Sequence, residues 1–422
     1  MRHTRRFTQA GWRGCKAEVG NTQVCFVVIF GSFIYISPEQ DAGAVTMKRG
    51  GVADLKLHPG RAPHWLVKRM IPMARALCQF IVDEFGTAEL LQRLADPVWF
   101  QALSNVLGYD WDSSGSTTVT CGVLKTALNF EQHGMIGVGG KGLASKKVPA
   151  QLRALEDYGL DGAGLVDISR SVAKVDNAGI QDGYNLYHHM FFVDSEENWT
   201  VVQQGMDYNS NDARRYHWTS FNLANFIEEP HSGLISGQIR DSALDMTSKD
   251  SAECRKVSVD IAREDPARVR RYFEDIRAYG QATLIPWIEG DGTPKELPSY
   301  KVTPTRMDWN AVRHAYETQP YHYDELLFLN GVGPATVRGL SLISEMIFGT
   351  PASWADPVRM CFAFGGKDGV PFPVPREAYD SAIDFMEQTL NDSKVRRQDK
   401  VLGLKRLRSF APPVLLARGM TP

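Results

Sequence analysis

Hydrophobic residues recur with two different periods along the chain, and the change of period separates a helical part from a sheet-forming part. Between Pro63 and Gly108, apolar residues return every three or four positions in three successive stretches. This is the pattern of amphipathic helices that share one core. The third stretch follows Asp96-Pro97, a common start for a helix. We therefore expect three consecutive helices here.

Further along, the pattern shortens to that of a β-hairpin. Its arms, Met190–Val193 and Trp199–Val202, are mostly apolar and enclose a short polar segment. A turn made of the four residues Ser195–Asn198 places His189 directly opposite Gln204. Polar side chains therefore collect at the end of the hairpin that lies away from the turn.

This polar end is the first candidate site. The order of a helix, an aspartate and a hairpin is also that of restriction-type PD-(D/E)xK nucleases, with Asp182 and His189 as ligands of Mg²⁺ or Mn²⁺. The chain lacks their acid-x-Lys signature, because it has Gln203-Gln204-Gly205 at that place. The alternative is a polar network that only orders the end of the sheet. The candidate catalytic residues are Asp182, His188, His189, Gln204, Lys174 and Asp176.

The segment WDSSGSTTV, residues 111–119, is a second place where a ligand could bind. Hydroxyl groups and a glycine come just before an expected helix, with Lys125 further along. Such a turn is suited to receive a phosphate group, although it lacks the GK[ST] order of a P-loop. The alternative is that a Ser or Thr side chain simply caps the helix.

Residues Leu326–Leu340 fit the helix-hairpin-helix pattern. Apolar residues of a first helix lead into a tight turn with Gly331 and Gly333, and a second helix then begins at Pro334. Glycines let the backbone come close to a ligand, and the amides at the start of a helix attract phosphate. We expect sequence-independent contacts with the DNA backbone, and the alternative is a plain helical hairpin. The expected DNA-binding residues are Gly331, Gly333, Thr336, Arg338 and, in a basic loop, Lys141, Lys146 and Lys147.

The stretch after this motif suggests a sharper function. It resembles the glycosylase branch of helix-hairpin-helix proteins, in which a catalytic aspartate follows a helix and a Gly-x-Pro turn. Asp356 takes that position here, whereas Ala335 stands where bifunctional members carry a Schiff-base lysine. The alternative is that Asp356-Pro357 starts another helix.

Composition sets the class of protein. The chain has 422 residues, 43% hydrophobic and 23% charged, and a net charge of −2. These values are typical of a globular protein with more than one domain, and any surface for nucleic acid must be local. The six cysteines form no CxxC pair, which argues against a zinc or iron–sulfur site and favours a reducing compartment. We expect a cytoplasmic protein.

The order of segments predicts an α+β fold that is predominantly helical, with an antiparallel hairpin or sheet in a large domain. Residues 1–46 combine a basic start with a short apolar run and are expected to be a non-native or disordered extension, with Met47 as the true start. The last segment is basic: from residue 391 onward, eight Lys or Arg residues stand against two Asp residues. The expected parts are the extension 1–46, the large domain 47–282, a linker 283–306, the helix-hairpin-helix domain 307–395 and the basic tail 396–422.

From Met47 to about Lys394 the chain resembles domain-of-unknown-function family 763 of bacteria and archaea. The resemblance is carried by collinear segments: GVADLKLHPGRAPHWL, RLADPVWFQAL, WDSSGSTTV, GGKGLASKK, SVAKVDNAGIQDGYNLYHH, VVQQGMD, ARRYHW, EEPH and FGGKDGVPFPV. It implies no activity, since the family has none assigned, and it supports Met47 as the start.

Two classes of function follow. In the first, the protein is an enzyme of DNA processing or repair, such as a metal-dependent nuclease with its site in the large domain. In the second, it is a non-catalytic DNA-binding adaptor, because no complete catalytic motif is present. Glycosylase-like chemistry with Asp356 is a further alternative. In each case the expected partner is DNA, bound through its phosphates, and not a membrane.

Overall fold

A computed structural model describes most of the chain. Side chains are described for residues 62–109, 114–277, 304–358 and 381–407. The backbone is also described for four early strands, for residues 360–361 and for helix ends at 278–282, 376–380 and 408–410. The predicted linker lies outside the described residues except for 304–306, as do residues 411–422 of the predicted tail.

Contacts divide the chain into two units, 1–49 with 364–370 and 50–363 with 371–422. The backbone of the first unit contains four strands paired antiparallel in chain order. Their bounds are β1 (Arg5–Phe7), β2 (Arg13–Val19), β3 (Thr22–Ile29) and β4 (Ser32–Ile36). All candidate residues lie in the second unit.

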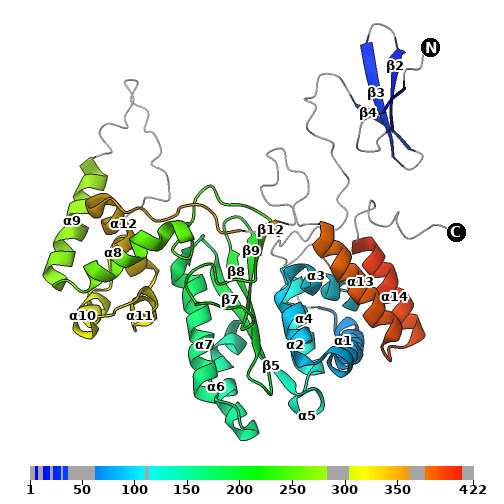
Figure 1. The fold of residues 1–422 in the computed structure, drawn as a ribbon, viewed down its shortest axis with the longest axis horizontal. Helices are drawn as coiled ribbons and strands as arrows, with labels where there is room; N and C mark the ends of the chain where they lie inside the picture. The colour runs from blue at the N-terminus through cyan, green and yellow to red at the C-terminus, as the bar shows by residue number, and fades with distance from the viewer. Residues whose placement is uncertain are drawn as a thin grey trace. The chain divides into compact units, whose positions relative to one another are not determined.

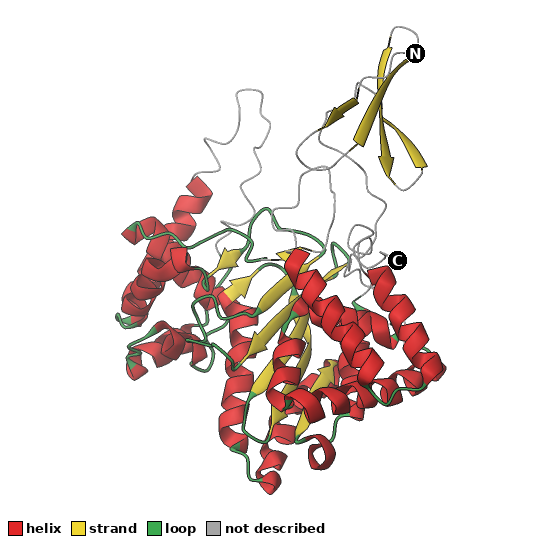
Figure 2. Cartoon of the chain, turned by 45° about the vertical axis from the view of Figure 1, so that its right-hand side comes forward, coloured by secondary structure: helices red, strands yellow, loops and turns green. Residues whose placement is uncertain are grey.

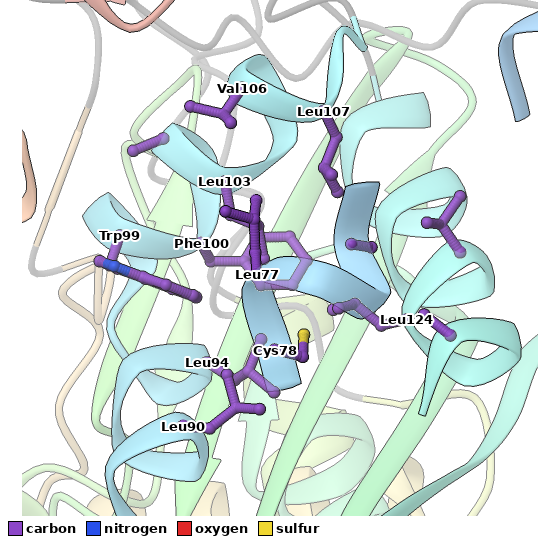
Figure 3. Packing of buried hydrophobic residues seen from close by; sticks show 14 of the residues in the cluster. Leu77, Cys78, Leu90, Leu94, Trp99, Phe100, Leu103, Val106, Leu107 and Leu124 are labelled. Atoms are coloured by element: carbon purple, nitrogen blue, oxygen red, sulfur yellow. The ribbon is translucent and has the colours of Figure 1, made fainter. Parts of the chain in front are cut away.

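The second unit begins with the three predicted helices and a fourth. They are α1 (His64–Phe85), α2 (Thr87–Ala95), α3 (Pro97–Leu107) and α4 (Gly115–Ala127). Asp96 caps α3, because its carboxylate accepts hydrogen bonds from the Val98 and Trp99 amides. Leu77, Phe100 and Leu103 are among the side chains that form the core between these helices (Figure 3).

Two C-terminal helices pack on the same core. They are α13 (Arg376–Asp392) and α14 (Arg397–Phe410), and both lie beside α3 in the ribbon (Figure 1). Leu390 and Leu407 are fully buried there, and the Arg406 guanidinium donates to the Val106 carbonyl. The segment expected to be a basic tail therefore contributes apolar residues to the core.

A central sheet has the strand order β12-β10-β9-β8-β7-β5. Neighbouring strands are antiparallel except for β10 and β12, which are parallel. The bounds are β5 (Met135–Lys141), β7 (Asn185–Asp194), β8 (Trp199–Asp207), β9 (Asp212–Thr219), β10 (Gly233–Ser236) and β12 (Met360–Cys361). A separate two-stranded pair joins β6 (Ile180–Gln181) to β11 (Leu244–Asp245).

Helices cover both faces of the sheet (Figures 1 and 2). On one face Met190, Val202 and Ile235 belong to the core of α1 to α4, and on the other α7 contacts β7 and β8. The remaining helices are α5 (Phe130–His133), η1 (Gly142–Lys147), α6 (Val148–Arg153), η2 (Ala154–Tyr158), α7 (Gly162–Lys174), η3 (Val175–Gly179), η4 (Lys249–Ser251), α8 (Ala252–Ala262), α9 (Pro266–Ala282), α10 (Trp309–Thr318), α11 (Tyr323–Phe328) and α12 (Pro334–Phe348).

The predicted α+β class with a majority of helix is confirmed, but the predicted register of the hairpin is wrong by one residue. His189 pairs with Gln203, and His188 pairs with Gln204. The turn is shorter than expected, since the Asp194 amide bonds to the Asn198 carbonyl and encloses three residues. The Asp194 carboxylate accepts from the Glu196 and Asn198 amides, and Glu197 takes a φ of 61°. This side-chain cap fixes the tighter turn.

In the described part of the chain, no helix is long and apolar enough to cross a membrane.

Candidate functional site

The two His–Gln pairs lie on opposite faces of the sheet. His189 and Gln203 are cross-strand neighbours on the face covered by α7, which we call the α7 face. His188 and Gln204 are neighbours on the face covered by α3 and α4, the α4 face. Successive residues of a strand point to opposite sides, so the two adjacent histidines have separate surroundings.

On the α7 face, four buried side chains form one chain of hydrogen bonds. Ser169 Oγ lies 2.9 Å from His189 Nε2, and His189 Nδ1 lies 2.7 Å from Gln203 Oε1. Gln203 Nε2 then donates to Asp176 Oδ2 at 2.5 Å. The order is therefore Ser169, His189, Gln203, Asp176, and we refer to these residues as the relay.

The relay fixes where its protons lie. Gln203 must turn its amide nitrogen toward the Asp176 carboxyl oxygen, which accepts, so its carbonyl oxygen faces His189. His189 Nδ1 therefore carries a hydrogen. Burial lowers the pKa of His189, although Gln203 and Asp176 oppose the shift, so the ring is neutral near pH 7 and Nε2 accepts. The Ser169 hydroxyl is then the donor to Nε2.

Asp176 is the buried end of the relay and has two further partners. Trp218 Nε1 donates to Oδ2 at 2.9 Å, and His231 Nε2 lies 2.6 Å from Oδ1. Asp176 lies on η3, a π-helical turn that continues α7, and its side chain is fully buried. The carboxyl group thus holds Gln203 in one orientation, with Trp218 and His231 holding the carboxyl group in turn.

The other end of the relay borders a pocket of about 230 Å³. Ser169 and His189 line it together with two basic residues, Lys146 and Arg170. Both basic residues are exposed, and the Arg170 guanidinium lies 3.7 Å from the Asp167 carboxylate, a long contact on the same helix. The pocket therefore combines a hydroxyl group, a neutral base and a positively charged rim.

On the α4 face the second pair is not bonded in the same way. Gln204 Nε2 donates to the Ser114 carbonyl at 2.9 Å and to the Tyr187 hydroxyl. Neither ring nitrogen of His188 has a hydrogen-bond partner among the described residues. Burial, with smaller contributions from His189 and Lys141, lowers the pKa of His188 to about 3. His188 and Gln204, both predicted to be catalytic, therefore share no hydrogen bond with the relay in the described structure, although His188 also borders its pocket.

Asp182, the other predicted metal ligand, belongs to a different cluster. Its Oδ2 accepts from Arg214 Nη1 at 2.8 Å and from the Tyr216 hydroxyl at 2.7 Å. Arg214 also donates to Asp356 Oδ2 at 2.6 Å, so the predicted glycosylase aspartate is in the same ion-pair cluster. Among the described residues, no group of three or more His, Cys, Asp or Glu side chains is placed to hold a metal ion. Asp182 and His189 thus belong to two different hydrogen-bonded clusters.

The predicted lysines are on β5, η1 and α7, and one of them lines the pocket. Lys141 ends β5, while Lys146 and Lys147 lie on η1, and all three are exposed. Lys146 lines the pocket of the relay. Lys174 ends α7 with its pKa lowered by burial, but no hydrogen bond joins it to the relay within the described structure.

The predicted helix-hairpin-helix forms a helical hairpin of α11 and α12. Gly331 has a φ of 86° and is exposed, as is Pro334 at the start of α12. Two predicted DNA contacts point elsewhere: Thr336 is 2% exposed, and Arg338 Nε donates to Gln181 Oε1 at 2.9 Å. Gln181 also donates to the Pro334 carbonyl at 2.8 Å. These bonds hold α12 against β6, the strand that directly follows η3, which carries Asp176.

Sequence reasoning named Asp176 and His189 but missed Ser169 and the role of Gln203. A signal for Ser169 was present: Leu165, Ser169, Val172 and Asp176 recur at the spacing of one buried helix face. Two polar residues on one buried helix face predict that both bind polar groups of the same neighbouring element. The role of Gln203 was missed because the turn was taken to be one residue too long, which put Gln204 opposite His189.

Comparison with known proteins gives one match. A family model described as a protein of unknown function, DUF763, matches residues 51–374. This range includes the relay, the Asp182 cluster and the hairpin of α11 and α12, and it confirms the resemblance drawn from the sequence motifs. No curated protein and no solved structure matches the chain.

Proposed function

The chain belongs to the DUF763 family, and we propose that it is a DNA-processing enzyme that cleaves a phosphodiester with Ser169 as the nucleophile. The observation that carries the proposal is the relay. Ser169 donates to a neutral His189, whose other nitrogen is held by Gln203. A base that is oriented by a third group is the arrangement that activates a serine hydroxyl.

The chemistry balances with these residues alone. Ser169 Oγ forms a bond to phosphorus as its proton moves to His189 Nε2, and the bond to the leaving sugar oxygen breaks. His189 returns the proton to that oxygen, which leaves a phosphoserine ester. Water then attacks the phosphorus and loses its proton to His189, while the bond between phosphorus and Ser169 Oγ breaks. His189 returns the proton to Oγ, which restores the serine hydroxyl. Gln203 accepts from Nδ1 throughout, so the imidazolium formed in each step stays in place.

The charge around the pocket favours a polyanionic substrate. Lys146 and Arg170 border the relay, and Lys141 and Lys147 are exposed on the neighbouring strand end and helix. A local cluster of basic residues in a chain with net charge −2 suits the phosphates of a nucleic acid. The exposed turn at Gly331 and Pro334 is a second place for backbone contact.

A cleavage assay tests this function. Labelled single-stranded, duplex and branched DNA and an RNA strand are incubated with the protein in EDTA, in Mg²⁺ and in Mn²⁺. We expect turnover by the wild type and a loss of roughly 100-fold or more in Ser169→Ala and His189→Ala. The matched control is Ser171→Ala on the same helix, which should cleave as the wild type does.

The assay also separates the alternatives. Cleavage by Ser169→Ala at the wild-type rate shows that another group is the nucleophile. Turnover by none of the preparations, with retained DNA binding, favours the non-catalytic adaptor. A loss in Asp356→Asn alone, with Ser169→Ala active, favours the glycosylase-like alternative.

A further inference from the structure

Two adjacent arginines of β9 have opposite surroundings. Arg214, on the α7 face, donates to the carboxylates of Asp182 and Asp356 at 2.8 and 2.6 Å. Arg215, on the α4 face, is also 0% exposed, but its described hydrogen-bond acceptors are all neutral. They are Gln101 Oε1 at 3.3 Å, Pro97 O at 3.4 Å and Thr117 Oγ1 at 3.5 Å.

The neutral surroundings of Arg215 are unfavourable for a charge. Its Nε has no hydrogen-bond partner in the described part of the chain, and its guanidinium lies over the Phe100 ring at 4.7 Å. Burial lowers the pKa of Arg215 to about 9, whereas the two carboxylates raise the pKa of Arg214. A buried cation without an acidic partner is costly unless an anion is supplied from outside the described residues.

Arg215 is one end of a polar row across four strands. Lys141, His188, Gln204 and Arg215 are successive cross-strand neighbours on β5, β7, β8 and β9. His188 has two ring nitrogens without partners, and Gln204 has a free Oε1, within the described structure. The row begins at exposed Lys141 on the edge strand and ends at buried Arg215.

The N-terminus of α4 meets this row. Gln204 donates to the Ser114 carbonyl, and Arg215 contacts Thr117 in the first turn of α4. Ser114 makes no side-chain cap to the helix, so the capping alternative proposed for this segment is not realised by Ser114. Ser116 is 0% exposed, and its hydroxyl has no partner among the described residues. The amides and partial positive charge of a helix start favour an anion.

We propose that the α4 N-terminus and the row ending at Arg215 form a binding site for a phosphate group. Arg215 supplies the charge, and Ser116 and the neutral His188 supply hydrogen-bond donors. The group is either free phosphate, the phosphate of a mononucleotide or one of a DNA strand. The site lies on the sheet face opposite Ser169, so it does not depend on the proposed catalytic function.

Thermal unfolding of the full chain tests the site. The melting temperature is measured in sodium phosphate and in sodium chloride of equal ionic strength, and then with deoxyadenosine monophosphate and with a short single-stranded oligonucleotide. We expect phosphate to raise the wild-type melting temperature in a saturable way, because a ligand that binds only the folded state stabilises it. The three ligands separate the three sources of the group.

Three variants complete the test. Arg215→Gln should bind phosphate roughly 10- to 100-fold more weakly, the effect of one charged hydrogen bond. Gln204→Glu places a carboxylate beside Arg215 and should abolish the phosphate effect while the protein stays folded. Arg214→Gln should be less stable in both buffers but keep the phosphate effect. An unchanged wild-type melting temperature with all three ligands, or an equal phosphate effect in Gln204→Glu, overturns the proposal.

Discussion

The Nδ1 atom of His189 lies 2.7 Å from the Oε1 atom of Gln203, its direct cross-strand neighbour. The adjacent pair, His188 and Gln204, lies on the opposite face of the sheet. Each of the two dipeptides, His188-His189 and Gln203-Gln204, thus contributes one residue to each of two sites. One is the relay with Ser169, and the other is the polar row that ends at Arg215.

Glutamate substitutions should distinguish the two glutamines. Gln203→Glu places a second carboxyl group at hydrogen-bond distance from Asp176, so we expect a loss of about 3 to 5 kcal/mol in the free energy of unfolding at pH 8. The loss should shrink at pH 5, where the new carboxyl group takes up a proton more readily. Gln204→Glu loses the hydrogen bond to the Ser114 carbonyl but gains the positive charge of Arg215, so its loss should be smaller than that of Gln203→Glu. Urea unfolding at both pH values measures the difference, and equal losses in the two variants contradict the assignment of faces.

His188 should make stability depend on pH. Burial lowers its pKa from 6.5 to about 3, so the folded state disfavours its protonated form. Between these values the unfolded chain binds a proton that the folded chain does not. The free energy of unfolding therefore decreases as pH falls through this window, by at most about 1.4 kcal/mol per pH unit for this residue.

The variant His188→Gln should reduce that dependence. Urea unfolding at pH 7, 5.5 and 4.5 gives the slope for variant and wild type. His217, whose pKa burial also lowers, keeps its own contribution in both proteins. An identical slope in the two proteins shows that His188 is not buried in its neutral form.

The two glycines of the helical hairpin should respond differently to alanine. Gly331 has a φ of 86°, and an added Cβ lies 3.1 Å from the Ala311 Cβ, so Gly331→Ala should cost about 1 to 2 kcal/mol. Gly333 has a φ of −116°, and the nearest atom to an added Cβ is 3.9 Å away. Gly333→Ala should therefore fold normally, and it is the cleaner variant for DNA binding. If it binds a DNA duplex as tightly as the wild type at each salt concentration, this turn is not a phosphate contact.

The helix expected to be a basic tail should contribute to stability. Leu407 of α14 is fully buried in the core of α1 to α4, so Leu407→Ala should lose about 2 to 5 kcal/mol by urea unfolding. Leu402 on the same helix is 42% exposed, and Leu402→Ala is the control with little change. Equal behaviour of the two variants argues that α14 does not pack on this core.

The sequence predicted three early helices, one β-hairpin and the turn at Gly331, because helical and hairpin periods depend on local patterns, but it did not predict β5, β9 and β10. Asp96-Pro97 as a helix start and the helical hairpin at Gly331 are examples, since each follows from the backbone preferences of its own residues. The arrangement of α14 could not be read in this way. Leu404 and Leu407 lie among lysines and arginines, so the segment was interpreted as a basic tail and its apolar face, which packs on α3, was not recognised.

The candidate site was predicted only in part. Asp176 and His189 were identified as polar groups near one end of a hairpin, but their bridge through Gln203 depends on the register. The Asp194 side chain sets that register by capping a three-residue turn. A turn longer by one residue would place Gln204, instead of Gln203, opposite His189. Arg214 and Asp356 are 142 positions apart in the chain, so only the tertiary fold could show that they form an ion pair.

The central claim is that His189 activates Ser169, and the most direct measurement is covalent labelling by a fluorophosphonate. Full-length protein is treated at pH 7.5, and the modified residue is located by mass spectrometry of its peptides. The relay predicts a single phosphonylated serine at position 169, with labelling slowed at least about 100-fold in His189→Ala and unchanged in Ser171→Ala. Labelling of Ser169 at the same rate in His189→Ala, or no labelling of Ser169 in the folded wild type, contradicts the account.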